Sequence, residues 1–166
     1  MDNPNGKHLG LIILTLAYPL THYIFIHIPN PVVPSANLAL NMIFPILAGY
    51  FYGPLSGAIA GAVGTGLSAL AGPDMYDALS ILPHALMGYT AGLAGESQSQ
   101  FAGALSIIIG HLLNILFYWR FGLIPFEHVG ILLLGLLTET TIDVVAIILL
   151  IVFLQKPFYR DKELRW

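Results

Sequence analysis

The sequence predicts an all-α integral membrane protein with six transmembrane helices and both termini in the cytoplasm. Of its 166 residues, 57% are hydrophobic and only 9% are charged, and the mean hydropathy is +0.80. A soluble domain carries about 25% charged residues. The apolar residues form long runs, of the roughly 20 residues that a helix needs to cross a bilayer. We therefore expect one multi-pass domain over residues 1–166, located in the cell membrane.

Six apolar segments are the predicted spans, and the breaks between them are rich in proline, glycine or charge. The second span is short, and Pro54 suits the first turn of the third, where its missing N–H is not needed. The predicted spans are 9–28, 37–52, 54–72, 77–95, 101–120 and 129–155.

The positive charges predict the orientation of these spans. Lys and Arg collect on the cytoplasmic side of membrane proteins. One lysine precedes the first span and four basic residues follow the last, so both ends are expected inside, which requires an even number of spans. Arg120 is the exception, on the outer side. The five terminal basic residues are Lys7, Lys156, Arg160, Lys162 and Arg165.

Glycines recur every four residues across the second and third spans, at Gly49, Gly53, Gly57 and Gly61. Small residues at this spacing let helix backbones approach closely in a membrane. We expect these glycines to form a packing seam that carries no chemistry.

Two carboxylates, Glu139 and Asp143, lie one helical turn apart within the most apolar segment of the chain, in the sequence TETTID. Each costs about 2.5–3.5 kcal/mol at the centre of a bilayer, so both are expected to face the interior of the bundle. Hydrogen bonding to neighbouring helices and ligand binding both stay open as their role. Ionisable groups within a membrane are a functional hypothesis by default.

Further polar residues occur in the fourth and fifth spans. His84 lies in the fourth, and His111, Asn114 and Tyr118 share one face of the fifth. A helical rise of about 1.5 Å per residue places all of them between the outer surface and the midplane. They predict a pocket that opens outward between spans four to six, with Arg120 at its rim. The acceptor-rich set favours a ligand with a cationic or hydrogen-bond-donating part.

The first outer loop, IPNPVVPSAN, is predicted to close over this pocket as a lid. Its prolines remove backbone N–H donors and disfavour helix. The residues expected in the gate are Pro31, Val32, Pro34 and Asn37.

Two glycine-rich runs, FPILAGYFYGPLSGAIAGAVGTGLSALAG and SILPHALMGYTAGLAG, resemble the substrate-binding S component of energy-coupling-factor (ECF) vitamin transporters. The resemblance covers roughly 9–155 and is strongest over 44–95. It implies a bundle that binds a vitamin or similar micronutrient near the outer face. It also implies a transmembrane coupling subunit and two ATPase subunits as partners. The Ala-x-x-x-Ala docking motif of the family has its nearest match at Ala17 and Thr21, so a shared or dedicated coupling subunit and a solitary arrangement stay open.

Two other functions were weighed against nutrient binding. A scaffold of the rod-shape-subunit type has a similar span count but little reason to keep two buried carboxylates. An intramembrane metalloprotein could use His84, His111, Glu139 and Asp143, which suit zinc or iron, although no H-E-x-x-H spacing occurs. No phosphate-binding G-x-x-x-x-G-K-[ST] loop is present. We expect neither catalysis nor a cofactor or resident metal, and partners limited to the nutrient, membrane lipid and transporter subunits, without nucleic acid.

Overall fold

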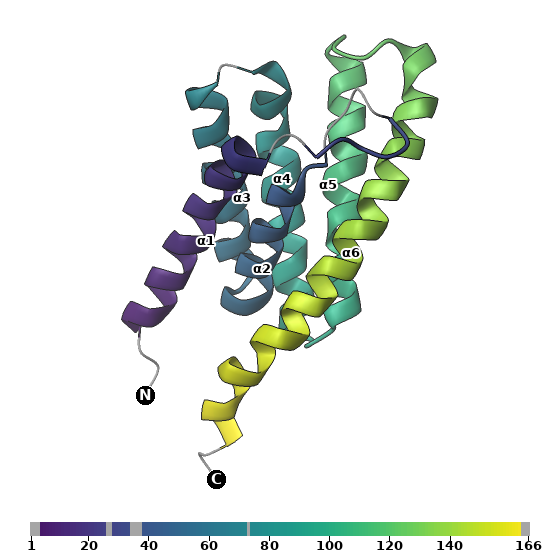
Figure 1. The fold of residues 1–166 in the computed structure, drawn as a ribbon. Helices are drawn as coiled ribbons and strands as arrows, with labels where there is room; N and C mark the ends of the chain where they lie inside the picture. The colour runs from purple at the N-terminus through teal and green to yellow at the C-terminus, as the bar shows by residue number, and fades with distance from the viewer. Residues whose placement is uncertain (1–3, 26–27, 34–37, 73, 164–166) are drawn as a thin grey trace.

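The computed structural model describes residues 4–25, 28–33, 38–72 and 74–163, and these residues are all-helical (Figure 1). The predicted all-α class is therefore confirmed. The described residues form six α-helices and one short 3-10 helix. Their bounds are α1 Pro4–Phe25, η1 Leu40–Met42, α2 Ile43–Tyr52, α3 Pro54–Ala71, α4 Met75–Glu96, α5 Gln100–Arg120 and α6 Phe126–Glu163.

Successive helices alternate in direction, so the connections fall at two opposite ends of the bundle (Figure 1). The start of α1 and the end of α6 lie at the same end as the α2–α3 and α4–α5 turns. The α1–α2, α3–α4 and α5–α6 connections lie at the other end, which we call the loop end. There the chain leaving α1 crosses the bundle to α6 before it returns to α2 (Figure 1).

Three of the helices, α3, α5 and α6, are long and apolar enough within the described residues to cross a membrane by themselves. The shortest is α2, with ten residues. The prediction for this segment was 37–52, and the difference has a local cause. Pro45 has no N–H for the carbonyl of Asn41, and its ring would clash with that carbonyl in an α-helix. The α-helix consequently begins at Ile43, and η1 precedes it.

The backbones of α2, α3 and α4 meet where Gly57 lies against Gly49 and Gly88. A Cβ atom added to Gly57 of α3 would lie 2.1 Å from the carbonyl oxygen of Gly88 in α4 and 2.6 Å from Cα of Gly49 in α2. One turn further along α3, a Cβ at Gly61 would lie 2.3 Å from the carbonyl oxygen of His84. No side chain fits at these distances, so glycine permits the three-helix contact.

Gly53 differs from the other members of the predicted seam. A Cβ atom there would meet nothing within 4 Å among the described residues, but a Cβ atom built on Gly92 of α4 would lie 2.7 Å from the carbonyl carbon of Gly53. It has a φ of +99° and joins α2 to α3, directly before Pro54. The positive φ of the turn requires glycine at this position, and the backbone of Gly53 lies close to α4 as well.

Helix α3 is packed with its small side chains inside and its large side chains outside. This is the arrangement expected where lipid, rather than water, surrounds a bundle, because small residues allow close packing and large aliphatic ones suit the acyl chains. The buried residues are Gly57, Ala60, Gly61, Gly64, Thr65 and Ser68. The exposed large residues are Leu55, Ile59, Val63, Leu67 and Leu70.

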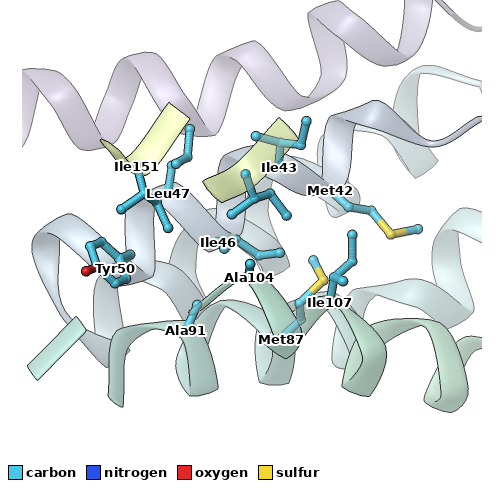
Figure 2. Close-up of a cluster of buried hydrophobic side chains, with 11 residues drawn as sticks. Met42, Ile43, Ile46, Leu47, Tyr50, Met87, Ala91, Ala104, Ile107 and Ile151 are labelled. Carbon is cyan, nitrogen blue, oxygen red and sulfur yellow. The ribbon is translucent and has the colours of Figure 1, made fainter. Parts of the chain in front are cut away.

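The apolar core lies where α2 meets α4, α5 and α6 (Figure 2). Ile46 of α2, Met87 of α4 and Ile107 of α5 are fully buried in it, together with Ile147 and Ile151 of α6. The last two continue a row of buried residues that recurs every four positions along α6. That row is Gly135, Glu139, Asp143, Ile147 and Ile151. The core therefore fixes the rotation of α6 that turns both carboxylates inward.

The three-helix contact predicts the outcome of one substitution. Gly57→Leu should abolish folded protein, because the new side chain would have to displace the backbones of both α2 and α4. Gly66→Leu on the same helix is the matched control, since a Cβ there meets nothing within 4 Å among the described residues. The yield of monodisperse protein in detergent is the measurement. A monodisperse Gly57→Leu variant would show that close packing at this point is dispensable.

Candidate functional site

His84 is the centre of a buried hydrogen-bond network that joins four helices. Its Nδ1 atom lies 2.8 Å from the hydroxyl of Tyr18 in α1 and 2.9 Å from that of Thr65 in α3. Its Nε2 atom lies 3.1 Å from the amide nitrogen of Asn114 in α5. Both ring nitrogens are thus engaged by side chains. These contacts indicate that His84 holds the four helices together, although it also borders a cavity described below.

Glu139 joins α6 to the segment that precedes α2. The side chain is 7% exposed, and its Oε1 atom accepts a hydrogen bond of 2.9 Å from the backbone N–H of Ala39. A carboxylate within a membrane needs such a donor, because water is not available to solvate it.

His111 and Asp143 lie beside Glu139. His111 Nδ1 is 2.7 Å from the hydroxyl of Thr140, and its Nε2 is 3.7 Å from Glu139 Oε1. Asp143 is fully buried, and neither of its carboxylate oxygens has a hydrogen-bond partner in the described part of the chain. One ligand atom from each of His111, Glu139 and Asp143 lies within 4.8 Å of the other two. The cluster contains two acidic groups and one imidazole in an enclosed space.

Two neighbouring cavities adjoin these groups. The smaller, of about 190 Å³, lies between α5, α6, residues 30–33 and η1. The larger, of about 450 Å³, lies between α1, η1, the start of α2 and α4. Ala39, Met42 and Tyr118 border both cavities and separate them. The sequence predicted a single pocket between spans four to six; Tyr118 of α5 and Leu150 of α6 also line the larger cavity, which in addition borders α1 and the start of α2.

The predicted binding residues divide between these places. His111, Asn114, Tyr118 and Glu139 line the smaller cavity. His84 and Tyr118 line the larger one. Asp143 belongs to the buried cluster and lines neither cavity. Arg120 is exposed at the end of α5 and lines neither of the two.

Asn30, which the sequence reasoning missed, fixes the loop between α1 and η1 to α6. It is 2% exposed, and its amide nitrogen donates a 2.9 Å hydrogen bond to the carbonyl of Gly135. Its Oδ1 atom accepts from the backbone N–H of Val32 at 2.9 Å and of Val33 at 3.1 Å. This side-chain turn is a conformation that asparagine favours. An asparagine between two prolines in the run IPNP was the available signal.

Two of the four residues expected in the gate belong to the described part of this loop. Pro31 and Val32 are exposed, and it is Val33 that is buried against Gly135. Pro34 and Asn37 lie outside the described residues.

A second group of polar contacts lies at and near the larger cavity, and of its members only Tyr118 was predicted as a binding residue. His22 Nε2 lies 3.4 Å from Asp77 Oδ2. The hydroxyls of Ser80 and Tyr118 are in hydrogen-bond contact, and the hydroxyl of Tyr76 donates to the carbonyl of Leu123 at 3.2 Å. These contacts tie the loop end of α4 to α5 and to the turn that leads into α6.

An all-helical bundle with large aliphatic residues exposed and polar groups enclosed defines a membrane-embedded binding protein. The family of ECF-type riboflavin transporters, S component, matches residues 11–159, and the chain belongs to this family. Comparisons with curated proteins and with solved structures gave no match. The resemblance seen in the sequence is confirmed. The chain is an integral membrane protein and the substrate-binding component of an ECF transporter. Members of this family work with coupling and ATPase components, and the family is one of transporter components rather than of enzymes.

The contacts of Asn30 lead to a prediction about the loop. Asn30→Ala should release residues 32 and 33 from α6, because both backbone N–H groups lose their acceptor and Gly135 loses a donor. Amide exchange at Val32 and Val33 should accelerate at least tenfold, since the variant loses three hydrogen bonds of about 1 kcal/mol net each and 1.4 kcal/mol is a factor of ten. Pro31→Ala at the exposed neighbour is the control. Unchanged exchange in Asn30→Ala would show that the loop is held by other contacts.

Proposed function

We propose that this chain is the high-affinity binding subunit for uptake of a vitamin or similar small organic micronutrient, which it binds at the loop end of a single domain. The loop end would face outward and both termini would face the cytoplasm. The alternating helix directions and the basic residues at the two ends support this orientation. Transport would be driven by separate coupling and ATPase subunits.

Six membrane passes are part of this proposal. Helices α1 and α4 each have 22 residues, or about 33 Å at a rise of 1.5 Å per residue. That length suffices for a hydrocarbon core of about 30 Å. Helix α2 is shorter, and it is enclosed by the other helices rather than surrounded by lipid, as its row of buried residues indicates.

The smaller cavity supplies the chemistry of the proposed site. Its walls include the apolar residues Ile115, Ile124 and Leu136. Asn114 Oδ1 is buried and has no hydrogen-bond partner among the described residues, while the Glu139 carboxylate borders the same space. A buried acceptor without a donor is costly, by about 1–3 kcal/mol. The observation that carries the proposal is this pair of acceptor-bearing side chains in the wall of an apolar cavity, which suits a flat, apolar ligand with N–H groups on one edge.

Riboflavin is the first ligand to test. The description of the matching family names it, and its ring system is flat and carries an N–H donor. Small-molecule sites usually measure about 300–1,000 Å³, so the smaller cavity of about 190 Å³ is too small alone. We infer that the nutrient also enters the larger cavity when residues 38–42, which separate the two, move aside.

The loop over residues 28–33 is the proposed lid. It covers the smaller cavity through Asn30 and Val33, and the backbone of Ala39 continues the same chain to Glu139. Lid opening would then limit the exchange of ligand.

The scaffold alternative is not favoured by these observations. Family membership already indicates substrate binding. A scaffold also gains nothing from a buried Asn114 oxygen that has no hydrogen-bond partner among the described residues, in a side chain that lines a cavity.

The binding proposal is tested by removing one charge. Glu139→Gln should bind riboflavin about 10- to 150-fold more weakly, because a hydrogen bond to a charged group contributes about 1.5–3 kcal/mol. The glutamine can still accept from Ala39 N–H, so the fold should persist. Calorimetric titration in EDTA is the measurement, and Glu127→Gln in the exposed first turn of α6 is the control. Equal affinity in Glu139→Gln and the parent would assign this carboxylate a structural role.

The lid is tested by locking it. The Cβ of Val33 lies 3.3 Å from a Cβ built on Gly135, close to the 3.5–4.5 Å of a disulfide, and the chain contains no cysteine of its own. In the Val33→Cys, Gly135→Cys double variant, oxidation should slow riboflavin association at least tenfold, and reduction should restore it. Each single variant serves as control. Fast association in the oxidised double variant would place the route of entry elsewhere.

A further inference from the structure

The cluster of His111, Glu139 and Asp143 contains more hydrogen-bond acceptors than donors. Asp143 is fully buried and points its carboxylate at the other two groups, yet neither oxygen has a hydrogen-bond partner among the described residues. Glu139 Oε1 receives the N–H of Ala39. His111 Nε2 is also 3.1 Å from the sulfur of Met42, another electron-rich atom. A positive charge among these electron-rich atoms would stabilise them, because buried charges are costly unless they are paired.

The hydrogen bond of the other ring nitrogen shows how His111 could serve as a ligand. Nδ1 lies 2.7 Å from the hydroxyl of Thr140. When Nδ1 donates its proton to that oxygen, Nε2 is left unprotonated and faces Glu139 and Met42. Metal-binding histidines are usually oriented in this way by a partner on the second nitrogen. In the opposite tautomer Asp143 would still lack a donor.

The spacing of the three ligand atoms suits a metal ion. Because they lie within 4.8 Å of one another, some point is no farther than 4.8/√3, or about 2.8 Å, from all three. Zinc binds histidine nitrogen and carboxylate oxygen at about 2.0–2.2 Å. Each side chain would therefore move inward by no more than about 0.8 Å.

Charge balance favours a divalent ion. Two ionised carboxylates in a dry interior are costly, and a doubly charged cation neutralises both. One imidazole and two carboxylates are ligands suited to zinc, manganese, iron or cobalt.

We propose that His111, Glu139 and Asp143 form a binding site for a divalent transition-metal cation at the floor of the smaller cavity. The ion leaves coordination positions free toward that cavity, because two of its ligands, His111 and Glu139, line it. This site replaces the expectation from the sequence that no resident metal is present. Metal binding of this kind does not depend on the proposed nutrient.

The test uses the full chain in detergent, freed of any tag and stripped with EDTA. Titration with Co²⁺ should give visible absorption bands that saturate at one equivalent and vanish when Zn²⁺ is added. Asp143→Asn and His111→Gln should each weaken Co²⁺ binding at least tenfold. His128→Gln, an exposed histidine in the first turn of α6, should bind like the parent. No saturable bands, or equal binding in Asp143→Asn and the parent, would overturn the proposal, as would loss of binding in His128→Gln.

Thermal unfolding of the parent keeps the proposal testable if a variant fails to fold. A cation that binds only the folded state raises the unfolding temperature as its concentration increases. The parent should show this rise with Zn²⁺ and lose it on adding EDTA, and an unfolding temperature independent of Zn²⁺ would overturn the site. These titrations contain no nutrient, and the riboflavin titration contains EDTA. Failure of the metal site and failure of the proposed function therefore give different results.

Discussion

The contact of three helix backbones at Gly49, Gly57 and Gly88 is the constraint on which the rest of the structure depends. Because α2, α3 and α4 touch there without intervening side chains, α2 is held in the middle of the bundle. Its outward row of large residues then has to be covered by α5 and α6, and this forms the apolar core (Figure 2). In a bilayer such packing replaces the water-driven burial that stabilises soluble domains.

The core in turn determines what α6 presents to the interior. Its buried row, repeating every four residues, is apolar at Ile147 and Ile151, where it meets α2. At Glu139 and Asp143 the same row is acidic. Helix α2 cannot extend toward the loop end to cover the two carboxylates, because Pro45 prevents α-helical geometry at Asn41 and the helix begins at Ile43. The space is left to η1 and the loop, whose free backbone N–H groups can solvate a carboxylate as Ala39 does.

Periodic features of the chain could be predicted from its sequence, and long-range ones could not. The inward direction of Glu139 follows from the cost of charge in lipid, and the close approach at Gly57 follows from glycine spacing. Gly53 has the same spacing but also forms the turn between α2 and α3, and spacing does not indicate that second role. The attachment of Asn30 to Gly135 joins residues 105 positions apart, and an irregular loop has no period to indicate such a contact. The larger cavity was missed because its walls come largely from α1 and α4, and no sequence pattern brings Tyr18 and Asp77 of these helices together.

The hydrogen bond between Ala39 and Glu139 connects the segment at residues 38–42 with the proposed binding groups. Glu139 accepts from Ala39, and Ala39 belongs to the segment that separates the two cavities. A ligand or cation that draws the Glu139 carboxylate toward itself competes with the Ala39 N–H for the negative charge of that group. Conversely, a displaced segment leaves the carboxylate without its donor and raises its affinity for a positive or donating partner. The two effects are reciprocal, because a change in one equilibrium through a shared group requires the same change in the other. Occupancy of the site and position of the segment at residues 38–42 are therefore expected to be coupled through Glu139, without any longer pathway through the bundle.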